Sequence, residues 1–136
     1  MRTVLSLLFA TSFMLMGCQE SFDERCAREA REFTAKHCPQ PQGEGCRMDS
    51  TTFDAATRTI VYHYTLYGPL DEETVRAKVV SGADSLRSMM LVSLKNSISL
   101  KEYKERGLNF TYTYASQSMR KTLLTLTFRP ADYAGR

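Results

Sequence analysis

Hydrophobic and polar positions alternate along two pairs of short segments, one in the middle of the chain and one near its end. The segments span residues 46–53, 58–67, 108–115 and 123–128, and each pair is separated by a short polar turn. Since successive side chains of a strand point to opposite faces, this period of two predicts strands that bury one face. The expected buried face carries Ile60, Tyr62, Tyr64, Leu66, Leu108, Phe110, Tyr112 and Tyr114. The opposite, solvent-facing side carries Val61, His63, Thr65, Tyr67, Thr111 and Thr113.

A helical period precedes each pair of strands. Ser21 and Glu24 have the spacing of a capping box, and an apolar residue then recurs near every fourth position until Pro39 ends the helix. A second helix is predicted to begin at residues 71–73, where acidic side chains favour a helix start, and to bury a stripe that runs to residue 94. Ser99 and Glu102 predict a second capping box and a short helix that stops at Gly107.

The order of these elements predicts an α+β fold. Two helix–strand–strand units would form one four-stranded antiparallel sheet with helices packed on one face, because the alternation leaves the other face polar. The tyrosine pairs at positions 62/64 and 112/114 occupy like places in the two units. We therefore expect residues 21–136 to form a single domain.

The amino-terminus has a different pattern. Arg2 precedes an apolar run from residue 4 to 16, which ends in Leu15-Met16-Gly17-Cys18. A basic start, an apolar middle and small residues at the cut are typical of a secretory signal. With cysteine at the cut, the segment resembles the lipobox of bacterial lipoproteins, although Met16 departs from the commonest pattern. An ordinary secretory signal and an uncut anchor are the alternatives, but the run is shorter than the roughly 20 residues of a membrane span.

The resemblance implies how the chain is divided and where in the cell the protein is located. Residues 1–17 would be a removed signal peptide, Cys18 would carry acyl chains such as palmitate, and residues 18–20 would be a short tether to the membrane. In Gram-negative lipoproteins Asp after the cysteine favours the inner membrane, so Gln19 implies the outer membrane of the cell envelope. The Tyr- and Thr-rich strands, Gly107 and Asp132-Tyr133 also resemble small uncharacterised lipoproteins of Bacteroidetes-type bacteria.

Charge and cysteine content limit the possible partners and cross-links of the protein. The 136 residues include 18 basic and 15 acidic side chains, a balance that does not favour nucleic acid as a partner. An exported chain can form disulfides, and Cys38 and Cys46 flank a flexible loop, so we expect this pair if any bridge forms, with Cys26 a buried thiol. A zinc site from Cys26, His37, Cys38 and Cys46 lacks the paired spacing of structural zinc sites.

The sequence contains no pattern that assigns a catalytic residue, a metal or a cofactor. His37 and His63 are the two histidines, and neither has a partner at a spacing typical of a general base. The leading interpretation is a membrane-anchored envelope lipoprotein that acts as a binding or adaptor module for an envelope protein. Its contact surface would be the polar sheet face, with Val61, His63, Thr65, Tyr67, Thr111 and Thr113. The alternative is a small envelope hydrolase with an unrecognised active site.

Overall fold

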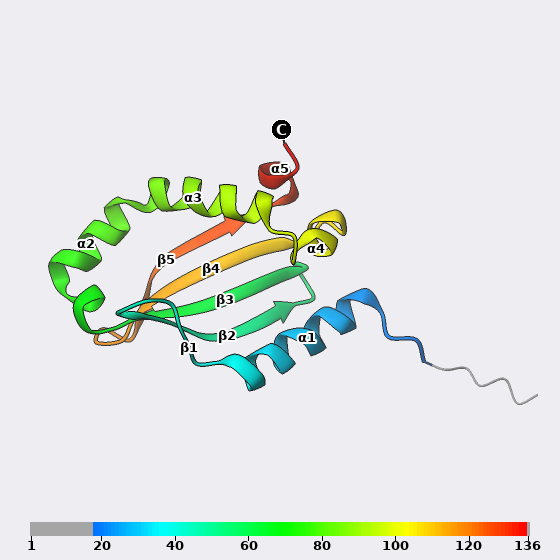
Figure 1. Cartoon of the computed structure of the whole chain (residues 1–136), viewed down its shortest axis with the longest axis horizontal. Coiled ribbons are helices and arrows are strands. Elements are labelled where there is room, and N and C mark those ends of the chain that lie inside the picture. Colours follow the sequence, from blue (N-terminus) through cyan, green and yellow to red (C-terminus); the bar gives the residue numbers. More distant parts are fainter. Residues whose placement is uncertain (1–17, 136) are drawn as a thin grey trace, which may run out of the picture.

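The polypeptide forms one twisted sheet with helices along two of its sides (Figure 1). The computed structural model describes residues 18–135. The strands lie in chain order β1-β2-β3-β4-β5. The elements are α1 (Phe22–His37), β1 (Gln40–Pro41), β2 (Cys46–Asp54), β3 (Thr59–Leu66), η1 (Gly68–Asp71), α2 (Glu73–Ser81), α3 (Ala83–Asn96), α4 (Lys101–Glu105), β4 (Asn109–Ser116), β5 (Lys121–Phe128) and α5 (Pro130–Tyr133).

The sheet is five-stranded and mixed, which corrects the four-stranded antiparallel sheet predicted from the sequence. β2/β3 and β4/β5 are antiparallel hairpins as expected, but β3 and β4 pair in parallel at the centre. The reason is the long connection through α2, α3 and α4, which returns the chain to the start of β3 before β4 begins. Such a crossover makes the joined strands parallel. The fifth strand, β1, is a two-residue pairing of Gln40 with Met48 and of Pro41 with Arg47.

The core lies on the face of the sheet that the helices cover. Leu108, Phe110 and Phe128 are fully buried, and Leu94 of α3 and Cys26 of α1 reach the same cluster from opposite sides. Tyr133 of α5 packs edge-on against Phe110 and donates its hydroxyl to the carbonyl of Leu108 at 2.7 Å. The predicted packing of the helices on one face is therefore what the structure shows.

The helix signals were correct in part. Ser21 and Glu24 form the expected capping box of α1, and Gly107 ends α4 with a φ of 70° that favours glycine. The second capping box is wrong: Leu100 is the N-cap of α4, the Ser99 hydroxyl lies 3.1 Å from that of Ser97, and Glu102 binds an arginine of α1. The single long helix predicted after residue 71 is also divided, with α2 and α3 meeting at Gly82.

Asp71 takes a role that its place in an acidic run did not suggest. Its carboxylate is buried and accepts hydrogen bonds from the Ser116 hydroxyl at 2.5 Å and from the backbone N–H of Ser118 at 2.8 Å. Arg76 adds a half-buried ion pair. The Ser116 hydrogen bond above all lowers the pKa of Asp71 to about 2. Asp71 thus fastens the β4–β5 turn to the connection that follows β3.

Candidate functional site

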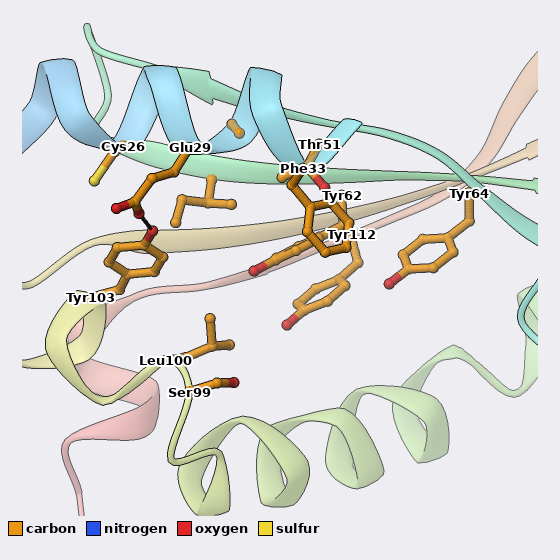
Figure 2. Close-up of a pocket in the computed structure, with 12 residues that line it drawn as sticks. Cys26, Glu29, Phe33, Thr51, Tyr62, Tyr64, Ser99, Leu100, Tyr103 and Tyr112 are labelled. Atoms are coloured by element: carbon orange, nitrogen blue, oxygen red, sulfur yellow. Dashed lines mark hydrogen bonds between the residues drawn. The ribbon is translucent and has the colours of Figure 1, made fainter. Parts of the chain in front are cut away.

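A groove of about 480 Å³ lies between α1 and the segment that joins α3 to α4, above the centre of the sheet (Figure 2). This volume is within the roughly 300–1,000 Å³ that is usual for small-molecule sites. α1 forms one wall, Ser99, Leu100 and Tyr103 form the opposite side, and the floor comes from β3 and β4. The lining residues are Cys26, Glu29, Ala30, Phe33, Thr51, Ile60, Tyr62, Tyr64, Ser99, Leu100, Tyr103 and Tyr112.

The parallel pairing of β3 with β4 builds the floor. Tyr62 lies opposite Tyr112 and Tyr64 opposite Tyr114, so the rings stack in pairs with centroids 5.0 Å apart. Tyr64 also stacks against Tyr112 at 6.4 Å, which joins the pairs into one row. Because the faces of the rings contact one another, the ring edges and hydroxyl groups are the parts that line the groove. The expected buried face is therefore confirmed, but its four tyrosines are only partly buried, and three of them, Tyr62, Tyr64 and Tyr112, line the groove.

Three tyrosine hydroxyls are free to interact with a ligand. The hydroxyl ends of Tyr62, Tyr64 and Tyr112 point in the same direction, away from α1 (Figure 2). Across residues 18–135, none of the three has a hydrogen-bond partner, and none is shielded completely from solvent. Burial raises the pKa of Tyr62 and Tyr64, and that of Tyr112 to about 12. All three are therefore protonated at neutral pH and can donate as well as accept hydrogen bonds.

The charge of the groove is concentrated at one end. Glu29 is the one residue of the described lining that carries a charge at neutral pH, and it accepts a hydrogen bond from the Tyr103 hydroxyl. Burial, followed by this hydrogen bond, raises the pKa of Tyr103. Arg25 of α1 lies 3.9 Å from the same carboxylate and also pairs with Glu102 of α4. The wall helix is thereby tied to α4 at this end.

The described residues of the groove do not contain a nucleophile paired with a base. Cys26 is 2% exposed, and burial raises its thiol pKa to about 11, so the reactive thiolate is scarce at neutral pH. Neither histidine belongs to the lining: His37 is the last residue of α1, and His63 points to the opposite face of the sheet. Within residues 18–135, no three His, Cys, Asp or Glu side chains are placed to hold a metal ion.

The face predicted to contact a partner lies on the far side of the sheet from the groove. His63 is at its centre, with Nε2 2.9 Å from the Thr52 hydroxyl and Nδ1 3.3 Å from that of Thr113. Burial lowers the pKa of His63. The structure brings together Val61, His63, Thr65, Thr111 and Thr113 as half-buried neighbours on β3 and β4, while Tyr67 follows the end of β3 under the guanidinium of Arg47.

Many polar groups of this face already have partners inside the chain. Thr111 shares a hydrogen bond of 2.9 Å with Thr127, and Thr65 donates to Asp49, which is also paired with Arg47. A partner that met this surface would find few polar atoms in need of a hydrogen bond. The use of this face as a contact surface stays a prediction. The groove has more polar groups without a partner in the described chain, so it is the stronger candidate for a binding site.

The cysteine predictions have different outcomes. Cys26 is a buried free thiol, as expected. Cys38 and Cys46 are also free in this structure. The bridge between them therefore stays a prediction, and thiol titration of the denatured protein tests it.

The sequence reasoning missed the groove because it assigned every tyrosine of the inner face to the core. One signal could have revealed it. Tyr62, Tyr64, Tyr112 and Tyr114 all occupy positions where phenylalanine would fill a dry core equally well. A tyrosine hydroxyl in such a place needs a partner or water, so four of them on neighbouring strands indicate a polar opening within the apolar layer.

Cys18 is exposed and precedes the α1 cap by three residues, while the proposed signal peptide, residues 1–17, lies outside the described residues. Between residues 18 and 135 no helix combines the length and the apolar character that a membrane crossing requires.

Comparison with known proteins supports the fold and gives the family. A crystal structure of a protein from Pseudomonas aeruginosa, described as a candidate secreted protein, superposes with a TM-score of 0.65 at 14% sequence identity. The match covers 85% of this chain and 99% of the other, so the two proteins share the fold. A search of curated proteins gives no match. The sequence profile of the family described as "Domain of unknown function (DUF8479)" matches residues 21–124, and the chain belongs to this family.

Proposed function

We propose that this protein is a non-enzymatic binding module of the bacterial cell envelope that holds an amphipathic ligand in its tyrosine-lined groove. The observation that carries the proposal is the combination of a largely apolar groove of about 480 Å³ with three tyrosine hydroxyls that have no partner in the described chain. Apolar walls supply affinity, and a few polar groups fix the orientation of a ligand. This is the arrangement of a binding site.

The same lining argues against the hydrolase alternative. A hydrolase would need an activated nucleophile or a positioned base in the groove. Cys26 has a raised thiol pKa, and the Glu29 carboxylate is engaged by Tyr103. Neither group is held against a second catalytic side chain in residues 18–135, so we assign them to the walls of the site.

The proposed anchor is Cys18, on the basis of the lipobox-like sequence that ends there. The secreted character of the structural neighbour agrees with an exported protein, and Gln19 favours the outer membrane. Glu20 forms a bidentate ion pair with Arg28, with N–O distances of 2.8 and 3.0 Å, and so folds back on α1. Cys18 and Gln19 alone would then separate the lipid from the domain, a span of about 7 Å.

This short tether favours a ligand or partner that belongs to the membrane or approaches along it. An envelope protein that takes up the bound ligand, or delivers it, is the partner that we propose. Replacing Cys18 with serine should move the protein to the soluble envelope fraction or leave a precursor. Normal processing with continued membrane attachment would contradict the anchor.

The binding function is tested separately with N-phenyl-1-naphthylamine, a dye that fluoresces in apolar sites. Protein that begins at Gln19 contains every described element of the sheet and core and avoids the lipid. We expect saturable dye binding that Ser99→Trp blocks, because an indole at this exposed position can fill the groove without deleting core atoms. Ser88→Trp is the matched control, at an exposed α3 position outside the lining. Equal dye binding by both variants would remove the groove as the site.

A further inference from the structure

We infer that the ligand is an uncharged lipid that carries ester or amide oxygens next to its acyl chains. This inference rests on the proposed binding function and names the ligand class of the same groove. Three features of the groove lead to it: its charge, its unpaired hydroxyls, and the absence of a free strand edge along its floor.

The charge of the lining disfavours anionic ligands. Glu29 carries the charge of the groove, and the part of the lining that the structure describes contains no lysine, arginine or histidine. A fatty-acid carboxylate or a lipid phosphate drawn into this groove would lose its water and would approach the carboxylate of Glu29. It would not gain a free cation, because Arg25, which lies 3.9 Å from Glu29, is already paired with Glu102. An uncharged molecule avoids both penalties.

The hydroxyl row disfavours a plain hydrocarbon. Tyr62, Tyr112 and Tyr64 follow one another with ring centroids 5.0 and 6.4 Å apart, and their hydroxyls face the groove together (Figure 2). A hydrocarbon would displace water from these groups and leave them unsatisfied. Sites built to hydrogen-bond a ligand discriminate strongly against analogues that lack the polar atoms. Ester or amide oxygens a few ångströms apart would accept these hydrogen bonds, while acyl chains would contact Phe33, Ile60 and Leu100.

The floor also disfavours an extended peptide. Peptides that bind to sheets usually add a strand to a free edge, where their backbone groups find partners. β3 is paired on both sides, with β2 and β4, and β4 is paired with β3 and β5. The backbone of the floor is thus already used, and only side chains meet the ligand. A lipid, which has no ladder of N–H and C=O groups to satisfy, fits this surface better.

The experiment uses the protein from Gln19 onward and measures displacement of N-phenyl-1-naphthylamine. The probes are 1,2-dioctanoylglycerol, octanoate, decane and an uncharged apolar octapeptide, which compare a neutral ester lipid with an anion, a hydrocarbon and an extended peptide. We expect dioctanoylglycerol to compete at least tenfold better than any of the other three. Tyr62→Phe and Tyr112→Phe should each weaken that competition about fivefold, the effect of one lost hydrogen bond, when it is calculated from the dye affinity measured for each variant.

Tyr67→Phe is the matched control, because it removes a tyrosine hydroxyl that lies outside the groove. It should not change the competition. Unchanged melting temperatures establish that the Tyr→Phe variants fold, since the deleted hydroxyls make no hydrogen bond within the described chain.

The outcomes separate this inference from the proposed function. Better competition by octanoate would mean that the groove accepts anions, and equal competition by decane with silent Tyr→Phe variants would mean that the hydroxyls do not select the ligand. Displacement of the dye by the apolar peptide but not by dioctanoylglycerol, octanoate or decane would mean that the ligand is a peptide and not a lipid. Each of these results overturns the inference and leaves a functional groove. Dye binding that Ser99→Trp does not block would instead remove the proposed function itself.

Discussion

Replacing Phe110 with alanine tests whether the centre of the fold is where the structure places it. Phe110 is fully buried at the start of β4, pairs with Ile60 and Phe128 across the neighbouring strands, and packs edge-on against Tyr133 at 5.7 Å. Removing its ring deletes buried apolar surface and leaves a cavity between the sheet and α5. These two terms together cost about 3–5 kcal/mol for a buried aromatic residue.

The loss should be measurable without preventing folding. Small domains are usually stable by about 5–15 kcal/mol, so most of this range leaves a folded protein. A shift of roughly 4 °C per kcal/mol for a domain of this size predicts a melting temperature lower by about 12–20 °C. Urea unfolding followed by circular dichroism gives the free energy directly, and an unchanged slope against urea shows that the same amount of surface unfolds.

Phe33→Ala is the matched control for this experiment. The same ring is deleted, but Phe33 is 37% exposed at the groove wall, so the free energy of unfolding should fall by less than half as much. An effect of Phe110→Ala that is no larger than that of Phe33→Ala would refute the assignment of Phe110 to the core. It would also undermine the parallel register of β3 and β4, since that register places Phe110 there.

Three further predictions concern other buried groups. Because the folded-state pKa of Asp71 lies below its ordinary value, its carboxylate stabilises the fold above about pH 4, and this contribution is lost as the pH falls towards 2. Asp71→Asn should therefore lower the free energy of unfolding at pH 7 and make that free energy depend less on pH between about 4 and 2. Cys26 should react with a thiol reagent at pH 8 only on unfolding, as stopped-flow absorbance would show. Tyr133→Phe should cost about 1–2 kcal/mol in urea unfolding, because it leaves the buried Leu108 carbonyl short of a donor.

Local patterns predicted the elements better than their assembly. Ser21 with Glu24 and Gly107 mark helix ends through contacts within a few residues, so the sequence alone predicts them correctly. The alternation along residues 58–67 and 108–115 likewise gives each strand and its buried face. The parallel pairing could not be predicted in this way, because two antiparallel hairpins can join through either edge. The way in which the connection between β3 and β4, residues 67–108, packs against the sheet decides whether these two strands pair in parallel or antiparallel.

The failures share a physical cause. Ser99 and Glu102 have the spacing of a capping box, but Glu102 gains an ion pair with Arg25 of α1 instead, a contact between residues far apart in sequence. Asp71 was expected to favour a helix start, yet hydrogen bonds from the distant β4–β5 turn hold it. In both cases a tertiary contact outweighs a local one. The groove also depends on tertiary structure, because the distance between two helices leaves the tyrosine edges uncovered.

α1 links the proposed anchor to the proposed site. Glu20 is fixed to Arg28 just before the helix, and Cys26, Glu29 and Phe33 on the next turns form the groove wall. Because a helix rises about 1.5 Å per residue, Cys26 lies only about 6 Å along the axis from the first residue of α1. The end of the groove that holds Glu29 and Tyr103 is therefore the end nearest to the tether. A lipid that leaves the bilayer beside Cys18 would meet this end first, so the short tether and the uncharged, tyrosine-lined groove favour the same class of ligand for independent reasons.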